Sequence, residues 1–407
     1  MLAAAPSAHI PAVVVGGSDN CGGLGVVRSL GQAGVPVIVV DREVTAPALH
    51  SRYARKAVMP ELSGYSLVQS LLALQARLNS RPVLFLTSDE AVLAVSEHRA
   101  ELQDSYRFSL PDHESLAALM KKNDFQRIAL AHGFPLPRSV RIRSVNDLGS
   151  LAALRFPAVV KPSVKTEDYL THEFERGYPV ASLDEAESVA RRILPVLSDL
   201  IVQEWIEGPD TAIYFCLMYR GRDGSVSSFT GRKLTIWPPA VGTTASCMAA
   251  PEVHDQLHRL TEAFFAAVSF VGMGSMEYKR DARSGAFFMI EPTVGRVDWQ
   301  EEVATLNGVN IPLAAYRHEI GAAAAPSIIP GQAVIWRDRA RHWKATRANP
   351  AAAVRLPGAQ VRDAYWRLAD PLPAVFHALT TFMRTLRRAL KRRETRRSDK
   401  AFSVSTR

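Results

Sequence analysis

The feature that most constrains the fold is a pair of strand-like segments that flank a short turn and carry one glutamate each. Residues 275–281 and 286–291 read as strands, and residues 282–285 (Ala-Arg-Ser-Gly) form the turn. A tight turn centred on Ser284, with no bulge in either strand, makes Glu277 and Glu291 direct cross-strand partners. Both carboxylates then lie on one face of the sheet, with Cβ atoms about 5 Å apart.

Two like charges held opposite each other destabilise a sheet unless something neutralises them. A hard cation such as Mg²⁺, which prefers carboxylate oxygens, removes this repulsion; an exposed acidic pair on an edge hairpin is the alternative. The chain leaves the second strand through Glu-Pro-Thr-Val-Gly-Arg, which delivers Arg296. The planar guanidinium of arginine suits phosphate, so the hairpin predicts the charges that phosphoryl transfer requires.

The composition is that of an ordinary globular enzyme. The 407 residues predict two to three domains, and the hydrophobic and charged fractions are 47% and 22%. Cys21, Cys216 and Cys247 are far apart and not in a metal-binding spacing, which indicates a reducing compartment. The sequence shows neither a signal peptide nor an apolar run long enough to span a membrane, so a cytoplasmic protein is predicted.

The positive charge is concentrated at the C-terminus. Of the net charge of +9, residues 384–407 contribute +8, from ten Lys and Arg against Glu394 and Asp399. A helix is predicted over about residues 375–397, with Phe376, Leu379 and Phe382 on one face and basic residues on the other. This pattern is typical of a peripheral contact with an anionic membrane, here the inner face, and equally of a docked helix with a solvated basic end. No nucleic-acid-reading motif accompanies it.

The N-terminal segment predicts a βαβ unit. Residues 12–15 and 35–40 read as buried strands, and a glycine-rich turn at 16–25 begins the helix between them. A dinucleotide site with Asp41 on a ribose is an alternative, but the glycines do not fit G-x-G-x-x-G. A further strand at 83–86 ends in Thr-Ser-Asp-Glu, where Ser88 or Asp89 either caps a helix or contacts a substrate.

Three later segments offer further polar candidates. The strand at 156–161 ends in Lys161 and is followed at once by a proline, which commits a flexible cation to the mouth of a cleft. The strand at 201–208 contains Gln203, Glu204, Trp205, Ile206 and Glu207, and exposed acids on a simple strand are its alternative reading. Arg232 and Lys233 suit a transferring phosphate or a substrate carboxylate, while Thr243, Thr244 and Ser246 suit a polar substrate.

The order of these parts over about residues 10–330 resembles the ATP-grasp superfamily, and within it the carboxylate–amine ligases related to D-aspartate ligase and the large subunit of carbamoyl-phosphate synthase. After a predicted helix from 112 to about 132, the run Ala-His-Gly-Phe-Pro-Leu-Pro resembles the entry to an ATP-grasp domain. The resemblance implies that Lys122, or its neighbour Lys121, and Lys161 bind phosphates. It also implies that residues 163–177 form a phosphate-covering lid, which is poor in glycine here.

The resemblance assigns the remaining site residues as well. Residues 203–207 would contact the adenine and ribose, and Glu277 and Glu291 would hold magnesium. Thr293 stands where the family has a metal-binding asparagine, which weakens a second metal site. The implied catalytic residues are Arg296, Arg232 and Lys233.

The expected fold is therefore α/β, of the α+β ATP-grasp type. The expected domains are a pre-ATP-grasp domain at 1–112, a two-lobed ATP-grasp domain at 113–328 and a C-terminal extension with a basic helix at 329–407. The expected activity uses ATP and Mg²⁺, with Mn²⁺ as an alternative, to join a carboxylate to an amine through an acyl phosphate, releasing ADP and phosphate. The alternatives are nucleotide binding without turnover and a membrane-peripheral scaffold.

Overall fold

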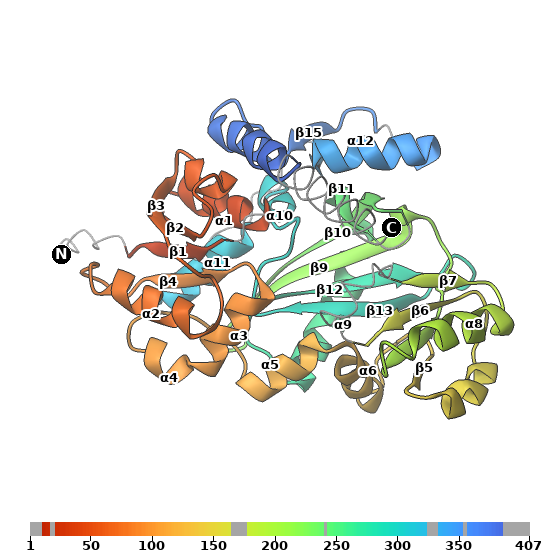
Figure 1. The fold of residues 1–407 in the computed structure, drawn as a ribbon. Helices are drawn as coiled ribbons and strands as arrows, with labels where there is room; N and C mark the ends of the chain where they lie inside the picture. Colours follow the sequence, from red (N-terminus) through yellow and green to blue (C-terminus); the bar gives the residue numbers. More distant parts are fainter. Residues whose placement is uncertain are drawn as a thin grey trace, which may run out of the picture.

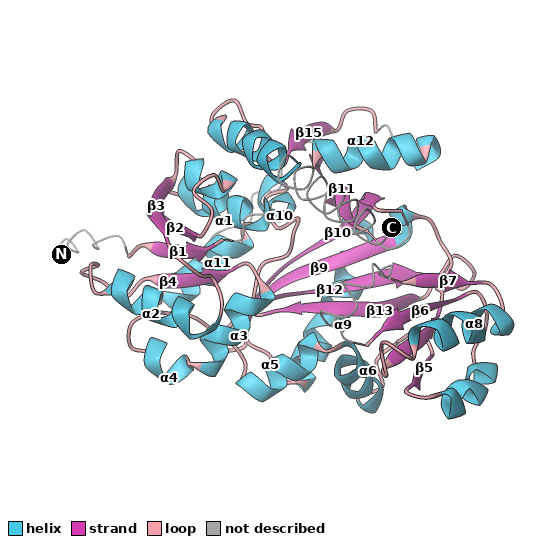
Figure 2. Ribbon diagram, viewed as in Figure 1, coloured by secondary structure: helices cyan, strands magenta, loops and turns pink. Residues whose placement is uncertain are grey.

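The computed structural model describes residues 10–16, 21–163, 177–239, 242–323, 333–352 and 356–385. Within these ranges the strands form three sheets, and helices cover them (Figures 1 and 2). The N-terminal sheet lies at one end of the molecule in Figure 1, and the other four-stranded sheet, which contains β5, β6, β7 and β8, lies at the other end. The long strands of the third sheet run between them, and the last elements of the chain lie along the top of the view.

The N-terminal sheet is parallel, in the order β3-β2-β1-β4. Its strands are β1 (Ala12–Val15), β2 (Val37–Asp41), β3 (Ala54–Val58) and β4 (Val83–Leu86). β1, β2 and β4 are buried along their whole length and apolar apart from Asp41 at the end of β2, as expected where helices cover both faces of a parallel sheet. This confirms the predicted βαβ unit; β3, half exposed and containing Arg55 and Lys56, was not predicted.

The large sheet has the order β13-β12-β9-β10-β11-β14-β15. Its strands are β9 (Ile213–Arg220), β10 (Val226–Trp237), β11 (Thr243–Ala249), β12 (Gly272–Arg280), β13 (Phe287–Val294), β14 (Val334–Arg337) and β15 (Gln360–Asp363). Because β9 is central and alternates, its side chains pack in two cores: Tyr214 and Cys216 on the side of helix α9, and Phe215 and Leu217 on the other side.

The small sheet has the order β5-β8-β6-β7, with β5 (Ser139–Ile142), β6 (Ala158–Pro162), β7 (Tyr178–Val180) and β8 (Leu200–Glu204). Ala158, Val160 and Val202 form a core of their own with α8 on one face of this sheet. The alternate residues Lys161 and Gln203 therefore lie on the other face. This arrangement leaves one face of the small sheet available to line a cleft.

The helices have the following bounds: α1 (Cys21–Gln32), α2 (Gly64–Gln75), α3 (Asp89–Glu97), α4 (Arg99–Leu102), α5 (His113–Met120), α6 (Lys122–Ala131), α8 (Leu183–Ile193), α9 (His254–Ala267), α10 (Glu302–Leu306), α11 (Ile311–Glu319) and α12 (Arg339–Ala348). The single helix predicted from 112 to about 132 is wrong, since the extended backbone of Lys121 divides α5 from α6. Ser88 caps α3 by accepting a hydrogen bond from the amide of Ala91 at 3.3 Å. Of the two alternatives, helix capping and substrate contact, capping is therefore the one observed for Ser88.

Two short pieces of the C-terminal extension are part of the large sheet. β14 pairs with β11, and β15 pairs with β14 in parallel. Residues 372–385 are helical, and this helix packs on the N-terminal domain through the stacked rings of Phe376 and His50 and a hydrogen bond from Thr380 to the carbonyl of Thr45. The predicted domain boundaries stay predictions, but the extension is closely integrated with the rest of the chain.

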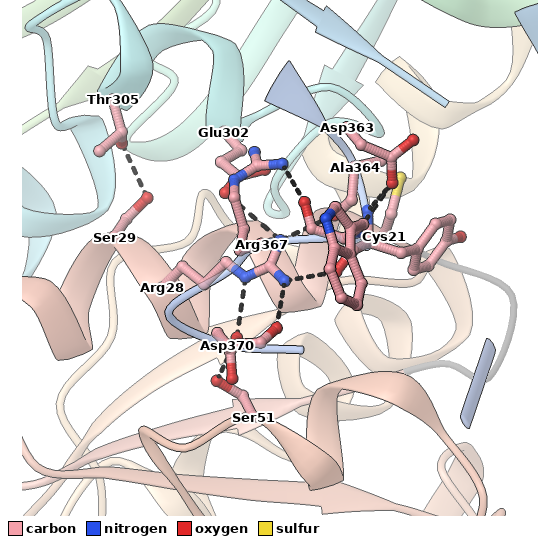
Figure 3. Close-up of polar contacts among 12 residues, drawn as sticks. Cys21, Arg28, Ser29, Ser51, Glu302, Thr305, Asp363, Ala364, Arg367 and Asp370 are labelled. Atoms are coloured by element: carbon pink, nitrogen blue, oxygen red, sulfur yellow. Dashed lines mark hydrogen bonds and ion pairs between the residues drawn. The ribbon is translucent and has the colours of Figure 1, made fainter. Parts of the chain in front are cut away.

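A buried network of charges fixes the extension to α1 (Figure 3). Arg28 is 1% exposed, and its Nε lies 2.9 Å from a carboxylate oxygen of Asp370. The same guanidinium donates to the carbonyls of Ala364 and Tyr365 at 2.8 and 2.6 Å. Asp370 also accepts hydrogen bonds from the hydroxyl of Ser51 at 3.0 Å and from the amide of Arg52 at 2.8 Å. Both carboxylate oxygens of Asp370 thus have hydrogen-bond partners from the N-terminal domain.

The basic tail itself lies outside the described residues from 386 onward. In its described part, Leu379 and Phe382 are 41% and 66% exposed, while Phe376 is docked. Within the described ranges, no helix combines the length and the apolar character needed to cross a membrane. Membrane contact by the tail therefore stays a prediction without structural support.

Candidate functional site

The hairpin of β12 and β13 brings the two predicted glutamates together. Glu277 and Glu291 are direct cross-strand partners, which confirms the predicted pairing. The assumption of an unbulged hairpin is wrong, because the register shifts between Glu277 and Tyr278. The irregularity lies on the turn side of the pair and sets its register. Tyr278 is opposite Met289, so a regular hairpin would place Ile290 opposite Glu277, and the extra residue in β13 brings Glu291 there instead. Thr293 lies two residues beyond Glu291, on the same face of β13, opposite Ser275.

Two lysines lie beside this acidic pair. The Nζ of Lys233 on β10 is 2.5 Å from a carboxylate oxygen of Glu277, and the Nζ of Lys122 at the start of α6 is 3.6 Å from Glu291. Burial raises the pKa of the Glu277 carboxyl, and Lys233 offsets this only in part. Burial by itself would lower the pKa of Lys233. The net effect is a raised pKa, because Glu277 and, more weakly, Asp298 and Glu291 favour the charged form of the lysine. The predicted metal and phosphate residues therefore form one charged cluster.

The small sheet supplies a third lysine. Lys161, on the face of β6 away from the α8 core, donates a hydrogen bond to Oε1 of Gln203 on β8 at 2.7 Å. Burial, followed by the charge of Lys122, lowers the pKa of Lys161 to about 7, and Glu291 acts in the opposite direction. Lys161 on the small sheet and Glu291 on the large sheet are therefore close enough for the charge of one to affect the other. Gln203 is 3% exposed, and its Nε2 has no hydrogen-bond partner among the described residues.

The linker between the two sheets is held in place by side chains from the large sheet. Lys279 donates hydrogen bonds from Nζ to the carbonyls of Gly208 and Pro209, both at 2.8 Å. Burial lowers the pKa of Lys279 to about 8. Lys279 was not predicted, although it lies two residues after Glu277 and so shares its face, a signal that strand alternation offers.

The predicted linker residues take different positions. Trp205 and Ile206 are half-buried, and the amide of Trp205 donates to the carbonyl of Pro157 at 2.9 Å. Glu204 accepts a hydrogen bond from the amide of Arg155 at 3.0 Å, and Glu207 pairs with Arg283, whose Nε lies 2.9 Å away. Both acids thus contact neighbouring segments. Such contacts are compatible with a nucleotide-binding linker and equally with a simple strand, so they do not decide between the two readings.

Arg232 is not part of the cluster. It is a direct partner of Tyr214 on β9 and of Met248 on β11, and Tyr214 lies on the α9 side of the sheet. Lys233 is the next residue in the strand and therefore points to the opposite face, that of Glu277. Adjacent residues of a strand point to opposite faces of the sheet. The prediction of Arg232 as a catalytic residue is therefore wrong, because Arg232 lies on the face away from Glu277.

Arg296 leaves β13 toward the N-terminal domain and pairs with Asp89, the first residue of α3. Burial by itself would lower the pKa of Arg296, but Asp89 raises it, with Asp298 and Glu291 adding to the effect. Asp298 was not predicted. It accepts hydrogen bonds from Ser275 at 3.0 Å and from Gln300 at 3.1 Å, and nothing in the local sequence marks it as a site residue.

A second polar group lies further along the same face of the sheet. Arg341 of α12 donates to the hydroxyl of Thr243 at 2.8 Å, and its guanidinium carbon lies 4.6 Å from the ring centroid of Trp299. The hydroxyl groups of Ser246 and Thr235 share a buried hydrogen bond of 2.8 Å. Of the predicted polar-substrate residues, Thr243 is half-buried, whereas Thr244 and Ser246 are about 1% exposed.

Several predicted features cannot be placed. The lid lies outside the described residues at 164–176, as does the central part of the glycine-rich turn at 17–20. Cys21, Cys216 and Cys247 are buried and form no disulfide with one another. Among the described residues, no group of three or more His, Cys, Asp or Glu side chains could hold a metal by itself. Two carboxylates beside lysines are nonetheless the donor set with which proteins hold Mg²⁺ jointly with phosphates.

Comparison with solved structures identifies the arrangement of these sheets. The chain matches purK, N5-carboxyaminoimidazole ribonucleotide synthetase in complex with ADP, with a TM-score of 0.59 and 14% identity over 80% of this chain and 81% of that one. It matches biotin carboxylase from Campylobacter jejuni with a TM-score of 0.62 and 14% identity, over 80% of this chain and 75% of that one. The chain has the ATP-grasp fold. The predicted fold class is thereby confirmed.

The sequence comparison points the same way. A D-aspartate ligase of Enterococcus faecium (strain Aus0004) is 23% identical over 335 residues, which cover 78% of this chain and 79% of that protein. No family model matches the sequence.

Proposed function

We propose that this chain is an ATP- and Mg²⁺-dependent ligase that joins a carboxylate to an amine through an acyl phosphate. The observation that carries the proposal is the joint placement of Lys122, Lys161, Lys233, Glu277 and Glu291 in one cleft of an ATP-grasp fold. The similarity to a D-aspartate ligase supports the carboxylate–amine reaction class. It also makes D-aspartate the first carboxylate to test.

In this proposal each side chain has a task that its surroundings suit. Lys122 and Lys161 bind phosphate oxygens, with Gln203 orienting Lys161, and residues 204–207 line the adenine and ribose. Glu277 and Glu291 hold Mg²⁺, and the divalent charge removes the cost of keeping the two carboxylates together. Mn²⁺ remains a predicted alternative. Bound Mg-ATP supplies the phosphoryl group.

The reaction then needs electrostatic stabilisation rather than a protein nucleophile. A carboxylate oxygen of the substrate attacks the γ-phosphorus and ADP leaves, which gives an acyl phosphate. The amine nitrogen attacks the acyl carbon, phosphate leaves, and the nitrogen loses a proton to give an amide. Lys233 and Arg296 stabilise the negative charge that develops on the transferred phosphoryl group. Thr243 and Arg341 are candidates for contact with the substrates.

Trapping with hydroxylamine tests the reaction class. The purified chain is incubated with Mg-ATP, hydroxylamine and one carboxylate at a time, with D-aspartate first, followed by other amino acids and hydroxy acids. Because hydroxylamine takes the place of the amine, an acyl phosphate is captured as a hydroxamate that depends on ATP. Formation of a hydroxamate with a carboxylate supports the proposal, whereas ATP turnover without a hydroxamate for any carboxylate contradicts it.

Nucleotide binding is expected to take up a proton at Lys161. Because the pKa of Lys161 is about 7 in the free protein, this amine is mostly neutral at pH 8 and mostly charged at pH 6. A phosphate beside it favours the charged form. We expect calorimetric titration with Mg-ADP, in buffers of different ionisation enthalpy, to show uptake of up to about one proton at pH 8 and almost none at pH 6.

The matched control for this experiment is Lys161→Met, which keeps the length of the side chain and removes the titrating group. This variant should bind Mg-ADP more weakly and lose most of the uptake at pH 8. If the uptake is the same in Lys161→Met and in the wild type, Lys161 does not contact phosphate.

Thr293→Asn tests how metal is held beside Glu291. An amide oxygen is a better ligand for Mg²⁺ than a neutral hydroxyl, and residue 293 shares a face with Glu291. We expect the Mg²⁺ concentration for half-maximal activity to fall by roughly three-fold, which corresponds to about 0.6 kcal/mol. Thr293→Val, of nearly the same shape, should shift this concentration upward or leave it unchanged. Identical magnesium dependence in all three proteins would remove residue 293 from the site.

A further inference from the structure

A second charged cavity lies at the other end of β4 from the candidate site. It has a volume of about 250 Å³, and four arginines line it: Arg81, Arg99, Arg107 and Arg222. Arg81 precedes β4, and Arg107 forms a parallel bridge to the first residue of that strand, Val83. The opposite end of β4 leads to Asp89 and Arg296. The four residues of β4 span about 13 Å, so the cavity is separate from the nucleotide cleft.

The four guanidinium groups are held by backbone carbonyls and not by acids. Each guanidinium group donates to one of these carbonyls: Arg81 Nε to Tyr106 O at 3.0 Å, Arg99 Nη1 to Leu110 O at 3.1 Å, Arg107 Nη1 to Glu319 O at 3.1 Å and Arg222 Nη2 to Phe108 O at 3.2 Å. Carbonyls fix the groups but leave their charge uncompensated. In the described part of the chain, none of the four lies within ion-pair distance of a carboxylate.

The acid in the lining, Glu319, is already engaged with neutral groups. Its Oε1 accepts hydrogen bonds from the hydroxyls of Ser109 at 2.5 Å and of Tyr219 at 3.2 Å. With one carboxylate against four guanidinium groups, the lining carries an excess of three positive charges. Burial and then the charge of Arg222 lower the pKa of Arg99, and Asp112, which is not within ion-pair distance, opposes them more weakly. The Nε of Arg107 is buried and has no partner among the described residues.

We propose that this cavity binds a small, multiply charged anion of the phosphate type. A guanidinium group has five N–H donors, and the hydrogen bonds of each of these arginines, to carbonyls and in Arg222 also to the hydroxyl of Ser109, use no more than two of them. The remaining donors suit an anion with several oxygens, which can receive charge-assisted bonds from more than one arginine. Such a ligand would also relieve the repulsion among the four cations. Inorganic pyrophosphate is the simplest probe of this chemistry.

Calorimetric titration of the full chain with sodium pyrophosphate, at constant ionic strength and without divalent metal, tests the proposal. The informative variant is Arg81→Gln/Arg222→Gln, because both side chains are exposed and lie outside helices and strands. Its control is Arg55→Gln/Arg127→Gln, which changes the same charge at two other exposed positions. We expect about a hundred-fold weaker binding in the first double variant and unchanged binding in the second, since each lost charge-assisted contact costs roughly ten-fold.

Lys161→Met separates this cavity from the nucleotide cleft, which would also attract pyrophosphate. The proposal predicts that Lys161→Met retains the binding that Arg81→Gln/Arg222→Gln loses. Arg222→Gln alone, with about a ten-fold loss, replaces the double variant if the latter does not fold. The proposal is overturned if the wild type shows no saturable binding, or if binding disappears in Lys161→Met and persists in the arginine variants.

Discussion

Glu291→Gln is expected to lower Mg²⁺-dependent turnover by about three orders of magnitude, or about 4 kcal/mol of transition-state stabilisation. Glu291 is one of two carboxylates that could hold the metal, and an uncharged amide is a much weaker ligand for a hard cation. The structural cost should be small. Its ion pair with Lys122 has an N–O distance of 3.6 Å, and the Glu291 side chain is 51% exposed, so its loss costs about 1 kcal/mol or less.

Activity assays and thermal unfolding of the same preparations check this prediction. Glu187→Gln, which removes an acid from an exposed helical ion pair with Arg191, is the matched control and should keep full activity. A Glu291→Gln protein that is folded and turns over at close to the wild-type rate would show that Glu291 does not hold the metal.

Asp370→Ala is expected to destabilise the protein by about 3–5 kcal/mol, because it removes the shorter ion pair of the buried Arg28 and leaves Glu302 alone to balance both Arg28 and Arg367. Asp370 is 2% exposed, and its loss also removes acceptors from Ser51 and from the amide of Arg52. The carbonyls of Ala364 and Tyr365 still bond to Arg28 but do not neutralise it. The free energy of unfolding, measured with denaturant, gives the magnitude directly.

Glu61→Ala is the control for this measurement, since Glu61 pairs with Arg42 and both side chains are about half exposed. Removal of such a pair should change the free energy of unfolding by about 1 kcal/mol or less. Equal, small effects of Asp370→Ala and Glu61→Ala would mean that the network of Figure 3 does not fix the extension to α1.

The local pattern of the chain was sufficient to predict the centre of the candidate site. Glu277 and Glu291 were paired correctly although the hairpin is not regular. The register at the turn, with Arg280 opposite Phe287, would place Ile290 opposite Glu277, and the bulge between Glu277 and Tyr278 moves Glu291 into that place. Lys161 could be placed at the end of a strand because apolar residues precede it and a proline follows. The resemblance to ATP-grasp enzymes then predicted that these residues lie together, and the ion pairs of Lys122 and Lys233 join the two lysines to the two glutamates.

The predictions that failed depend on information that is not local. Arg232 and Lys233 are both basic, and only the register with β9 shows which of them shares a face with Glu277. Asp298 enters the site through a loop after β13, with no periodic pattern to reveal it. The arginine cavity joins residues from three distant segments, so it is invisible in the sequence. Arg28 and Asp370 are 342 positions apart, and each reads as an ordinary surface residue until the fold buries both.

The most direct test of the proposed ligase activity is the release of ADP by the purified chain in four parallel reactions. Each contains Mg-ATP, together with no addition, a carboxylate alone, an amine alone, or both, over a panel of carboxylates and amines. The ligase account predicts that ADP release rises strongly when one particular carboxylate and one particular amine are both present, with an equimolar amide detected by mass spectrometry. ADP release at the same rate in all four reactions, with no amide for any pair, would contradict it.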